Sequence, residues 1–142
     1  MIHILLETAD ILAVDKPEGP ASIHDQGKEC LLSLLAAQFP EKLYVVHRLD
    51  KEVSGVILFA RNAAAHKHLT QQFSDRNVEK RYVTLTHSVI EQDSGVIDKP
   101  LRGFGSGRMG VDAERGKPSS TEFRVTERLR SYTLVEAYPH TG

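Results

Sequence analysis

The 142-residue sequence lacks the features that mark disulfide-rich and membrane-spanning proteins. Its one cysteine, Cys30, cannot form an internal disulfide, which fits a reducing compartment. The longest apolar run is Val56–Ala60, far shorter than the roughly 20 residues of a membrane-spanning helix. The first residues carry no basic leader and no small-residue cleavage site. We therefore expect a cytoplasmic protein with no contact with a membrane.

The sequence also lacks an excess of charge of either sign. It has 18 basic and 19 acidic residues, for a net charge of -1. This balance excludes a strongly basic protein that coats nucleic acid, although it permits a local basic groove. Apolar residues make up 40% and charged residues 26%, which is typical of a globular chain. The length fits a single domain spanning residues 1–142.

The hydrophobic pattern predicts more strands than helices. Leucines spaced along Gly27–Phe39 predict an amphipathic helix, and Asn62 predicts the N-cap of a second helix ending near Asp75. The segment Leu101–Pro118 is rich in glycine and polar residues, which is typical of a long excursion or hairpin. Because the strands do not alternate regularly with helices, we expect the α+β class. The predicted strands are Ala9–Val14, Leu43–Val46, Gly55–Ala60, Tyr82–Thr86, Phe123–Thr126 and Tyr132–Ala137.

Two patterns resemble ligand sites but lack the context that such sites need. The glycines from Gly105 to Gly110 have the Gly-x-Gly-x-x-Gly spacing, yet no strand is predicted before them and no helix after them. His66 and His68 lie two residues apart, whereas helical metal-ligand pairs lie four apart. We expect both histidines on a solvated helix surface and no metal site.

The segment Val45–Gly55 leads from two apolar residues into alternating charge and ends at a glycine before the next predicted strand. Asp50 lies between Arg48 and Lys51, and two cations beside a carboxylate favour its anionic form. Such a carboxylate could act as a nucleophile at neutral pH. The alternative is a surface loop of ordinary ion pairs.

His47-Arg48-Leu49-Asp50, followed by Ser54-Gly55, resembles the central motif of the RluA-type pseudouridine synthases. The similarity spans practically the whole chain, because three further segments follow the family's order. These are Ile11–Val14 leading to Lys16-Pro17 and Gly19, Lys80-Arg81-Tyr82 with Leu85, and Arg108–Asp112 with Gly116-Lys117-Pro118 and Thr121.

The sequence departs from the family pattern at two places. Val53 stands where the family usually has threonine. Family members also continue beyond the equivalent of Thr141-Gly142 into Arg-x-His-Gln-Ile-Arg, whose arginine pairs with the catalytic aspartate. The resemblance implies the N-terminal portion of a catalytic domain, without a separate N-terminal RNA-binding domain. Its fold would be a mainly antiparallel central sheet flanked by helices and loops, incomplete at the C-terminus.

The resemblance also implies a reaction, the conversion of uridine within structured RNA to pseudouridine, without cofactor or metal. Asp50 would be the nucleophile, or the group that drives elimination to a glycal. Tyr82 would stack on the uracil, and its hydroxyl could help remove a proton. Arg48 would fill the gap left by a flipped base or pair with a carboxylate. Further RNA contacts would come from His47, Lys16, Lys80, Arg81 and Arg108.

Two other functions remain open on the sequence. The chain could be a non-catalytic RNA-binding or interaction module on the same scaffold, or a structural α+β domain. Because the closing arginine motif is absent, we expect these 142 residues alone to be inactive. An uncovered strand edge would also make them prone to self-association.

Overall fold

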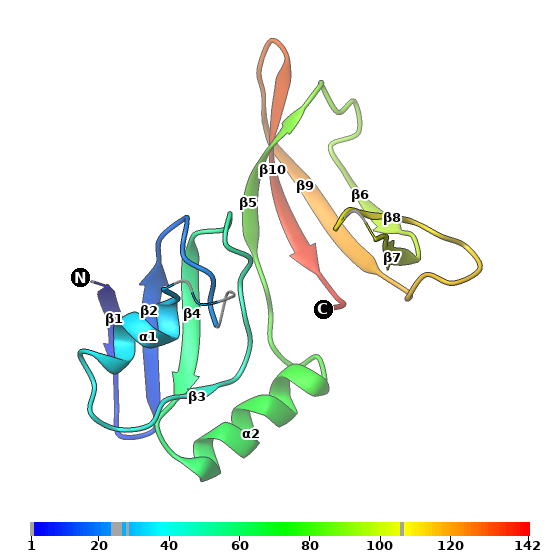
Figure 1. Cartoon of the computed structure of the whole chain (residues 1–142). Helices are drawn as coiled ribbons and strands as arrows, with labels where there is room; N and C mark the ends of the chain where they lie inside the picture. Colours follow the sequence, from blue (N-terminus) through cyan, green and yellow to red (C-terminus); the bar gives the residue numbers. More distant parts are fainter. Residues whose placement is uncertain (1, 24–26, 28, 106) are drawn as a thin grey trace. The chain divides into compact units, whose positions relative to one another are not determined.

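The computed structural model describes residues 2–23, 27, 29–105 and 107–142. It divides into two compact units, Met1–Asn77 and Val78–Gly142, and each is described by itself (Figure 1). All strand pairs among the described residues are antiparallel. The predicted α+β class with mainly antiparallel strands is confirmed, and the strands form two four-stranded sheets and one two-stranded sheet.

The first unit is built on a sheet with the strand order β1-β2-β4-β3. Its strands are β1 (His3–Glu7), β2 (Ile11–Lys16), β3 (Tyr44–Val45) and β4 (Gly55–Ala60). The short helix α1 (Leu31–Ala36) buries Leu31 and Leu35 completely. β2 and β4 supply further fully buried core residues, namely Leu12, Val14, Ile57 and Phe59. The site described below lies beside the ends of these two central strands.

Helix α2 (Ala63–Ser74) contacts β3 and β4. The predicted N-cap is confirmed, because the Asn62 side chain accepts a hydrogen bond from the backbone N–H of Ala65 at 2.8 Å. His66 does not lie on a solvated surface as predicted. Its Nε2 lies 3.1 Å from the carbonyl oxygen of Val45, and its ring packs against Tyr44, while His68 is exposed. The position of His66 on the inner side of α2 accounts for the difference.

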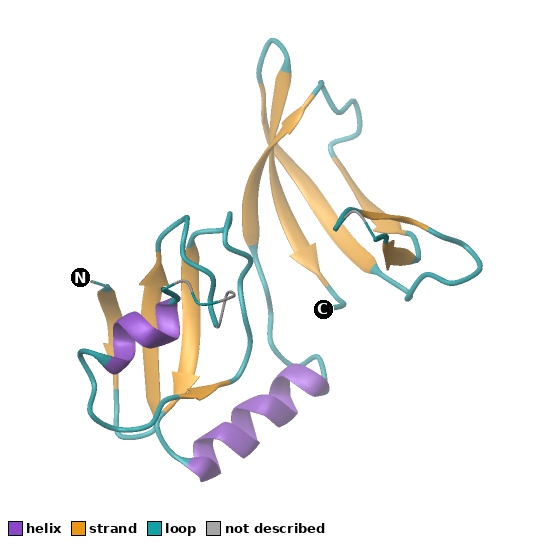
Figure 2. Cartoon of the chain, in the orientation of Figure 1, coloured by secondary structure: helices purple, strands orange, loops and turns teal. Residues whose placement is uncertain are grey.

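The second unit consists of strands and loops in its described part (Figure 2). Its main sheet has the order β5-β10-β9-β6. The strands are β5 (Tyr82–His87), β6 (Ser94–Asp98), β9 (Ser120–Arg128) and β10 (Tyr132–Pro139). Thr133 and Val135 of the central strand β10 are buried. The predicted strands Tyr82–Thr86, Phe123–Thr126 and Tyr132–Ala137 thus lie in one sheet as β5, β9 and β10, and β6 adds a strand that the sequence did not predict.

The glycine-rich excursion is a hairpin of β7 (Leu101–Gly103) and β8 (Met109–Val111). Its base is closed by hydrogen bonds in both directions between the backbones of Leu101 and Lys117. Gly116 is required there, because a Cβ on it would lie 2.3 Å from the carbonyl oxygen of Asp112. The residues that follow the Gly105–Gly110 pattern form a strand and a turn. No described helix in either unit has the length and apolar character to cross a membrane.

Candidate functional site

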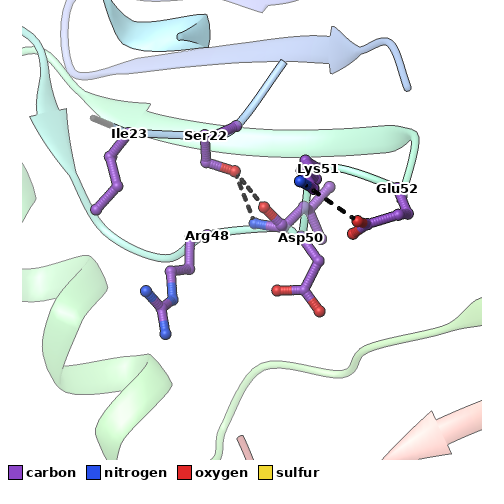
Figure 3. A pocket seen from close by; sticks show the side chains of 8 residues that line it. Ser22, Ile23, Arg48, Asp50, Lys51 and Glu52 are labelled. Carbon is purple, nitrogen blue, oxygen red and sulfur yellow. Dashed lines mark hydrogen bonds and ion pairs between the residues drawn. The ribbon is translucent and has the colours of Figure 1, made fainter. Parts of the chain in front are cut away.

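The Asp50 segment runs alongside the core with alternating exposure. Leu49 is buried, whereas Arg48 and Asp50 on either side of it are exposed. Side chains alternate in direction along an extended backbone, so burial of Leu49 turns its two neighbours outward. Figure 3 shows the Arg48 and Asp50 side chains on the same side of the loop, away from Ser22. The apolar residue in the motif thus orients both polar ones.

Ser22 fixes this segment from the inside. Its Oγ accepts a hydrogen bond from the backbone N–H of Leu49 at 2.9 Å and donates one to the carbonyl oxygen of Leu49 at 2.5 Å. Ser22 is buried, so both backbone groups of Leu49 are satisfied without water. The sequence did not predict this role, because an isolated serine 27 residues before its partner carries no local signal.

Lys16 fixes the other end of the loop. It is fully buried at the end of β2, and its Nζ donates to the carbonyl oxygens of Pro17 at 3.0 Å, Lys51 at 3.3 Å and Val53 at 2.7 Å. Burial lowers the pKa of Lys16, while the carboxylates of Glu52, Asp50 and Glu18 act in the opposite direction. An ammonium group held by three carbonyls inside the fold supports the loop. We therefore give Lys16 a positioning role in place of the RNA contact expected from the sequence.

His47 also takes part in the fold. Its Nε2 accepts a hydrogen bond from the backbone N–H of Leu58 at 3.0 Å, and its ring stacks on Phe73 with centroids 4.6 Å apart. These contacts tie the start of the motif to β4 and α2. The expected RNA contact of His47 remains a hypothesis beside this structural role.

An open pocket of about 350 Å³ lies over the motif. Its lining comes from two stretches of the chain, Ala21–Ile23 and Arg48–Glu52. Lys51 approaches Glu52 at 4.0 Å, and within the described residues neither Arg48 nor Asp50 forms an ion pair. The Asp50 carboxylate therefore lines the pocket without a salt bridge to any residue that the structure describes.

The remaining candidate residues belong to the second unit. Tyr82 begins β5, is half-buried, and lies opposite Ala137 in the register of β10. Lys80 donates from Nζ to the carbonyl oxygen of Thr141 at 2.9 Å, and Arg81 forms an ion pair with Glu136. Arg108 is exposed on the hairpin. Lys80 and Arg81 thus have contacts within their own unit in addition to any contact with RNA.

Glu136 lies at the centre of a small polar network on the second sheet. It accepts hydrogen bonds from the Tyr138 hydroxyl and from Arg81. The Tyr138 hydroxyl and Arg81 lower the pKa of Glu136. The hydrogen bond between Tyr138 and Glu136 in turn raises the pKa of Tyr138. The network therefore favours a charged carboxylate beside a protonated phenol.

The described residues contain no group of three or more His, Cys, Asp or Glu side chains that could hold a metal ion. The chemistry available to the site in the first unit is that of a carboxylate and a guanidinium group beside an open pocket. A carboxylate can attack an electrophilic carbon or stabilise developing positive charge.

Comparison with known proteins finds similarity along nearly the whole chain. The family model described as RNA pseudouridylate synthase matches residues 10–142. The dual-specificity RNA pseudouridine synthase RluA of Vibrio vulnificus is 41% identical over 150 residues, which cover 99% of this chain and 60% of the relative. The uncharacterized RNA pseudouridine synthase YlyB of Bacillus subtilis is 34% identical over 154 residues, which cover 99% of this chain and 50% of the relative.

Two solved human structures have a similar fold. Human RNA pseudouridylate synthase domain containing 4 superposes with a TM-score of 0.80 at 28% identity, covering 99% of this chain and 59% of that one. Human RNA pseudouridylate synthase domain containing 1 gives a TM-score of 0.85 at 27% identity, covering 100% and 60%. The chain thus spans between half and three-fifths of the length of these relatives. The match over residues 10–142 and the RluA-type relatives establish that the chain belongs to the RNA pseudouridylate synthase family and is of the RluA type.

Proposed function

We propose that the protein carrying this chain isomerises specific uridines in structured RNA to pseudouridine, with Asp50 as the nucleophile. One observation carries the proposal. Asp50 presents an exposed carboxylate to a pocket, and its backbone neighbours are fixed by buried Ser22 and Lys16. Preorganising the backbone around a reactive group reduces the cost of aligning that group with substrate.

The reaction keeps all its atoms. The bond between the sugar C1′ and uracil N1 breaks, uracil turns, and a bond from C1′ to uracil C5 forms, with the proton leaving C5 and one returning to N1. Breaking a glycosidic bond builds positive charge on the sugar. The Asp50 carboxylate would capture C1′ covalently and be displaced when uracil C5 attacks. On the other route it would take the proton from C2′ in an elimination to a glycal and return it to C2′ as uracil C5 adds to C1′. Neither route needs a metal or a cofactor.

Arg48 and Tyr82 have supporting roles in the proposal. A base inside a paired region must leave the stack before an enzyme can reach it, and Arg48 would fill the space that it leaves. The exposed guanidinium, which lacks an ion pair with any other described residue, supports this role. Tyr82 would stack on the uracil ring.

The substrate would be ribosomal or transfer RNA, met in the cytoplasm. Curated relatives include a dual-specificity RNA pseudouridine synthase and a ribosomal large subunit pseudouridine synthase C. Contacts with phosphate would come from Arg108, together with Lys80 and Arg81, whose charges lie near the start of β5.

The test is replacement of Asp50 by asparagine in the natural protein that carries this sequence. Asn keeps the volume and removes the nucleophile, so pseudouridine formation should fall to background while RNA affinity stays within about twofold. Pseudouridine is measured by carbodiimide labelling of uridine-containing ribosomal and transfer RNA, and affinity by filter binding.

Asp15→Asn is the matched control, because Asp15 is an exposed aspartate of β2 in the same unit. It should retain wild-type turnover. Product from Asp50→Asn at the wild-type rate would show that another group is the nucleophile. RNA binding without product from the unmodified natural protein would favour the non-catalytic RNA-binding module.

A further inference from the structure

The β7–β8 hairpin and its flanks concentrate positive charge in a chain that is nearly neutral overall. Residues 99–118 include five basic side chains and two acidic ones, whereas the whole chain has a net charge of -1. Local positive charge of this kind attracts a polyanion. The hairpin therefore has the electrostatic character of a nucleic-acid contact.

One face of the hairpin combines this charge with an aromatic ring. Arg102 lies opposite Gly110 in the register, and the backbone N–H of Phe104 donates to the carbonyl oxygen of Arg108 at 2.9 Å. Because side chains alternate along a strand, Arg102 and Phe104 point to one face of the hairpin. The Arg102 guanidinium lies 5.7 Å from the centre of the Phe104 ring, within the range of a cation–π contact.

The ring is held in place by its neighbours. A Cβ on Gly110 would lie 2.9 Å from Cε2 of Phe104, so the ring rests directly against the backbone of β8. Arg102 is fixed in turn by an ion pair with Asp112 at 3.1 Å. Asp112 also accepts hydrogen bonds from the backbone N–H groups of Glu114 and Arg115, which lower its pKa together with Arg102. The aromatic surface is therefore preorganised.

Despite these contacts, Phe104 remains 46% exposed. Arg108 is also exposed, and it has no ion pair with another described residue. An exposed ring on an ordered, positively charged hairpin matches a ligand with a flat aromatic surface and a negative charge. A nucleotide in single-stranded RNA has both, and its base can stack on an aromatic side chain whatever its sequence.

We propose that Phe104 is a stacking platform for an unpaired base of the substrate RNA outside the uridine that reacts, and that Arg108 contacts the neighbouring phosphate. The identity of the ligand as substrate RNA rests on the proposed function. Stacking on Phe104 would favour unpaired over paired RNA, because a base stacked inside a duplex has no free face for Phe104.

The experiment measures binding of the 142-residue chain to two fluorescein-labelled RNAs by fluorescence anisotropy. One is a hairpin with an unpaired uridine-containing loop, and the other is the same stem as a blunt duplex. Phe104→Leu keeps apolar volume against Gly110 but removes the π-face. It should weaken binding to the loop RNA by about 5- to 100-fold and leave duplex binding within about twofold. Phe104→Tyr should bind both RNAs like the wild type.

Met109→Ala is the matched control, since Met109 is 66% exposed and lies beside Gly110, on the alternate face of the same hairpin. It should change the affinity for either RNA by no more than about twofold.

Equal loss of loop and duplex binding in Phe104→Leu would show that the hairpin fold matters and the stacking does not. Wild-type loop binding by Phe104→Leu would also overturn the platform, while leaving the proposed function intact. If the natural protein makes pseudouridine but the wild-type chain shows no preference for loop RNA, the platform alone is rejected. If neither activity nor RNA binding occurs, both proposals fail.

Discussion

At the scale of single residues, the backbone position of Asp50 depends on residues that are more buried than Asp50 itself. Ser22 and Lys16 are both buried, and both bind backbone groups of the Asp50 loop, not its side chains. The carboxylate can therefore remain exposed while its backbone is fixed. Asp50 carries the proposed reactive group, whereas Ser22 and Lys16 hold the loop backbone. Substitutions can therefore test the two roles separately.

Replacement of Lys16 by methionine tests the positioning role. Methionine fills similar space but leaves the carbonyl oxygens of Lys51 and Val53 without their donor. We expect the free energy of unfolding to fall by about 1–3 kcal/mol, with reduced turnover in the natural protein. Urea denaturation measures the first effect. Lys51→Met is the control, because the Lys51 side chain is 59% exposed, and equal unfolding midpoints for the two variants would contradict the role.

Tyr82 allows stacking to be separated from its hydroxyl. Tyr82→Phe keeps the aromatic face, so we expect slower turnover with unchanged RNA affinity. Tyr82→Leu loses the face as well and should weaken RNA binding by about 5- to 100-fold. Single-turnover kinetics and filter binding on the natural protein give the two values. Wild-type rates for both variants would remove Tyr82 from the site.

At the scale of elements, the second sheet joins its strands through polar side chains as well as through the backbone. Arg81 at the start of β5 pairs with Glu136 of β10. On β9, Arg124 pairs with Glu122 at 3.0 Å and lies 5.3 Å from the Tyr138 ring centre. The charged form of Glu136 is the link between β5 and the rest of this network.

This link makes stability depend on pH. The pKa of Glu136 is lowered from 4.5 by Tyr138 and Arg81, so its contribution is present above the unfolded-state pKa and is lost as pH falls through the folded-state pKa. Glu136→Gln cannot titrate. We expect wild type to have the higher melting temperature near pH 7, and the difference to shrink as the pH falls below 4.5.

Glu127→Gln serves as the control, because Glu127 is an exposed carboxylate of β9 without an ion pair among the described residues. Its melting temperature should follow that of wild type across the same range. A difference between wild type and Glu136→Gln that stays constant with pH would contradict the assigned role of Glu136.

Elements with strong local signals were predictable from the sequence. The strand Gly55–Ala60 has the predicted bounds, because it is a run of apolar residues that begins at a glycine with φ 126°. The first helix is shorter than predicted, Leu31–Ala36 instead of Gly27–Phe39. Gly27 has φ 82° and Cys30 is extended, so neither can belong to a helix.

Strands that depend on contacts with residues far away in the sequence were not predictable. β6 contains Gly95, which normally weakens a strand. Here the glycine makes room for Phe123 on β9, whose ring would lie 2.8 Å from a Cβ. β1 was also missed, since its exposed Leu5 and Leu6 break the alternation expected of a strand. Within the site, the motif indicated Asp50, but the supports from Ser22 and Lys16 needed the structure.

At the scale of the whole molecule, exposed apolar residues on an end strand favour self-association of the chain in solution. β5 is an end strand of its sheet, and Val83 and Leu85 on it are 64% and 53% exposed. Such strands tend to pair with another chain unless charge prevents it. We expect the 142-residue chain to self-associate with increasing concentration, as measured by sedimentation velocity.

Leu85→Lys should reduce this self-association, because a charged residue on an end strand opposes pairing between sheets. Leu129→Lys is the control at a leucine that is 43% exposed but lies in the loop between β9 and β10, outside any end strand. A monomeric wild-type chain at all concentrations would contradict the prediction. Equal effects of the two substitutions would assign the association to general apolar exposure.

The contacts that fix the Asp50 loop have a consequence for biosynthesis. Lys16, Ser22, Leu49 and Val53 all lie in the first unit, which ends at Asn77. A ribosome adds roughly 5–20 residues per second, so the second unit follows over several seconds. During that interval the nascent chain already contains these four residues, which hold the backbone around Asp50. The first unit can thus form these hydrogen bonds before synthesis of the second unit is complete.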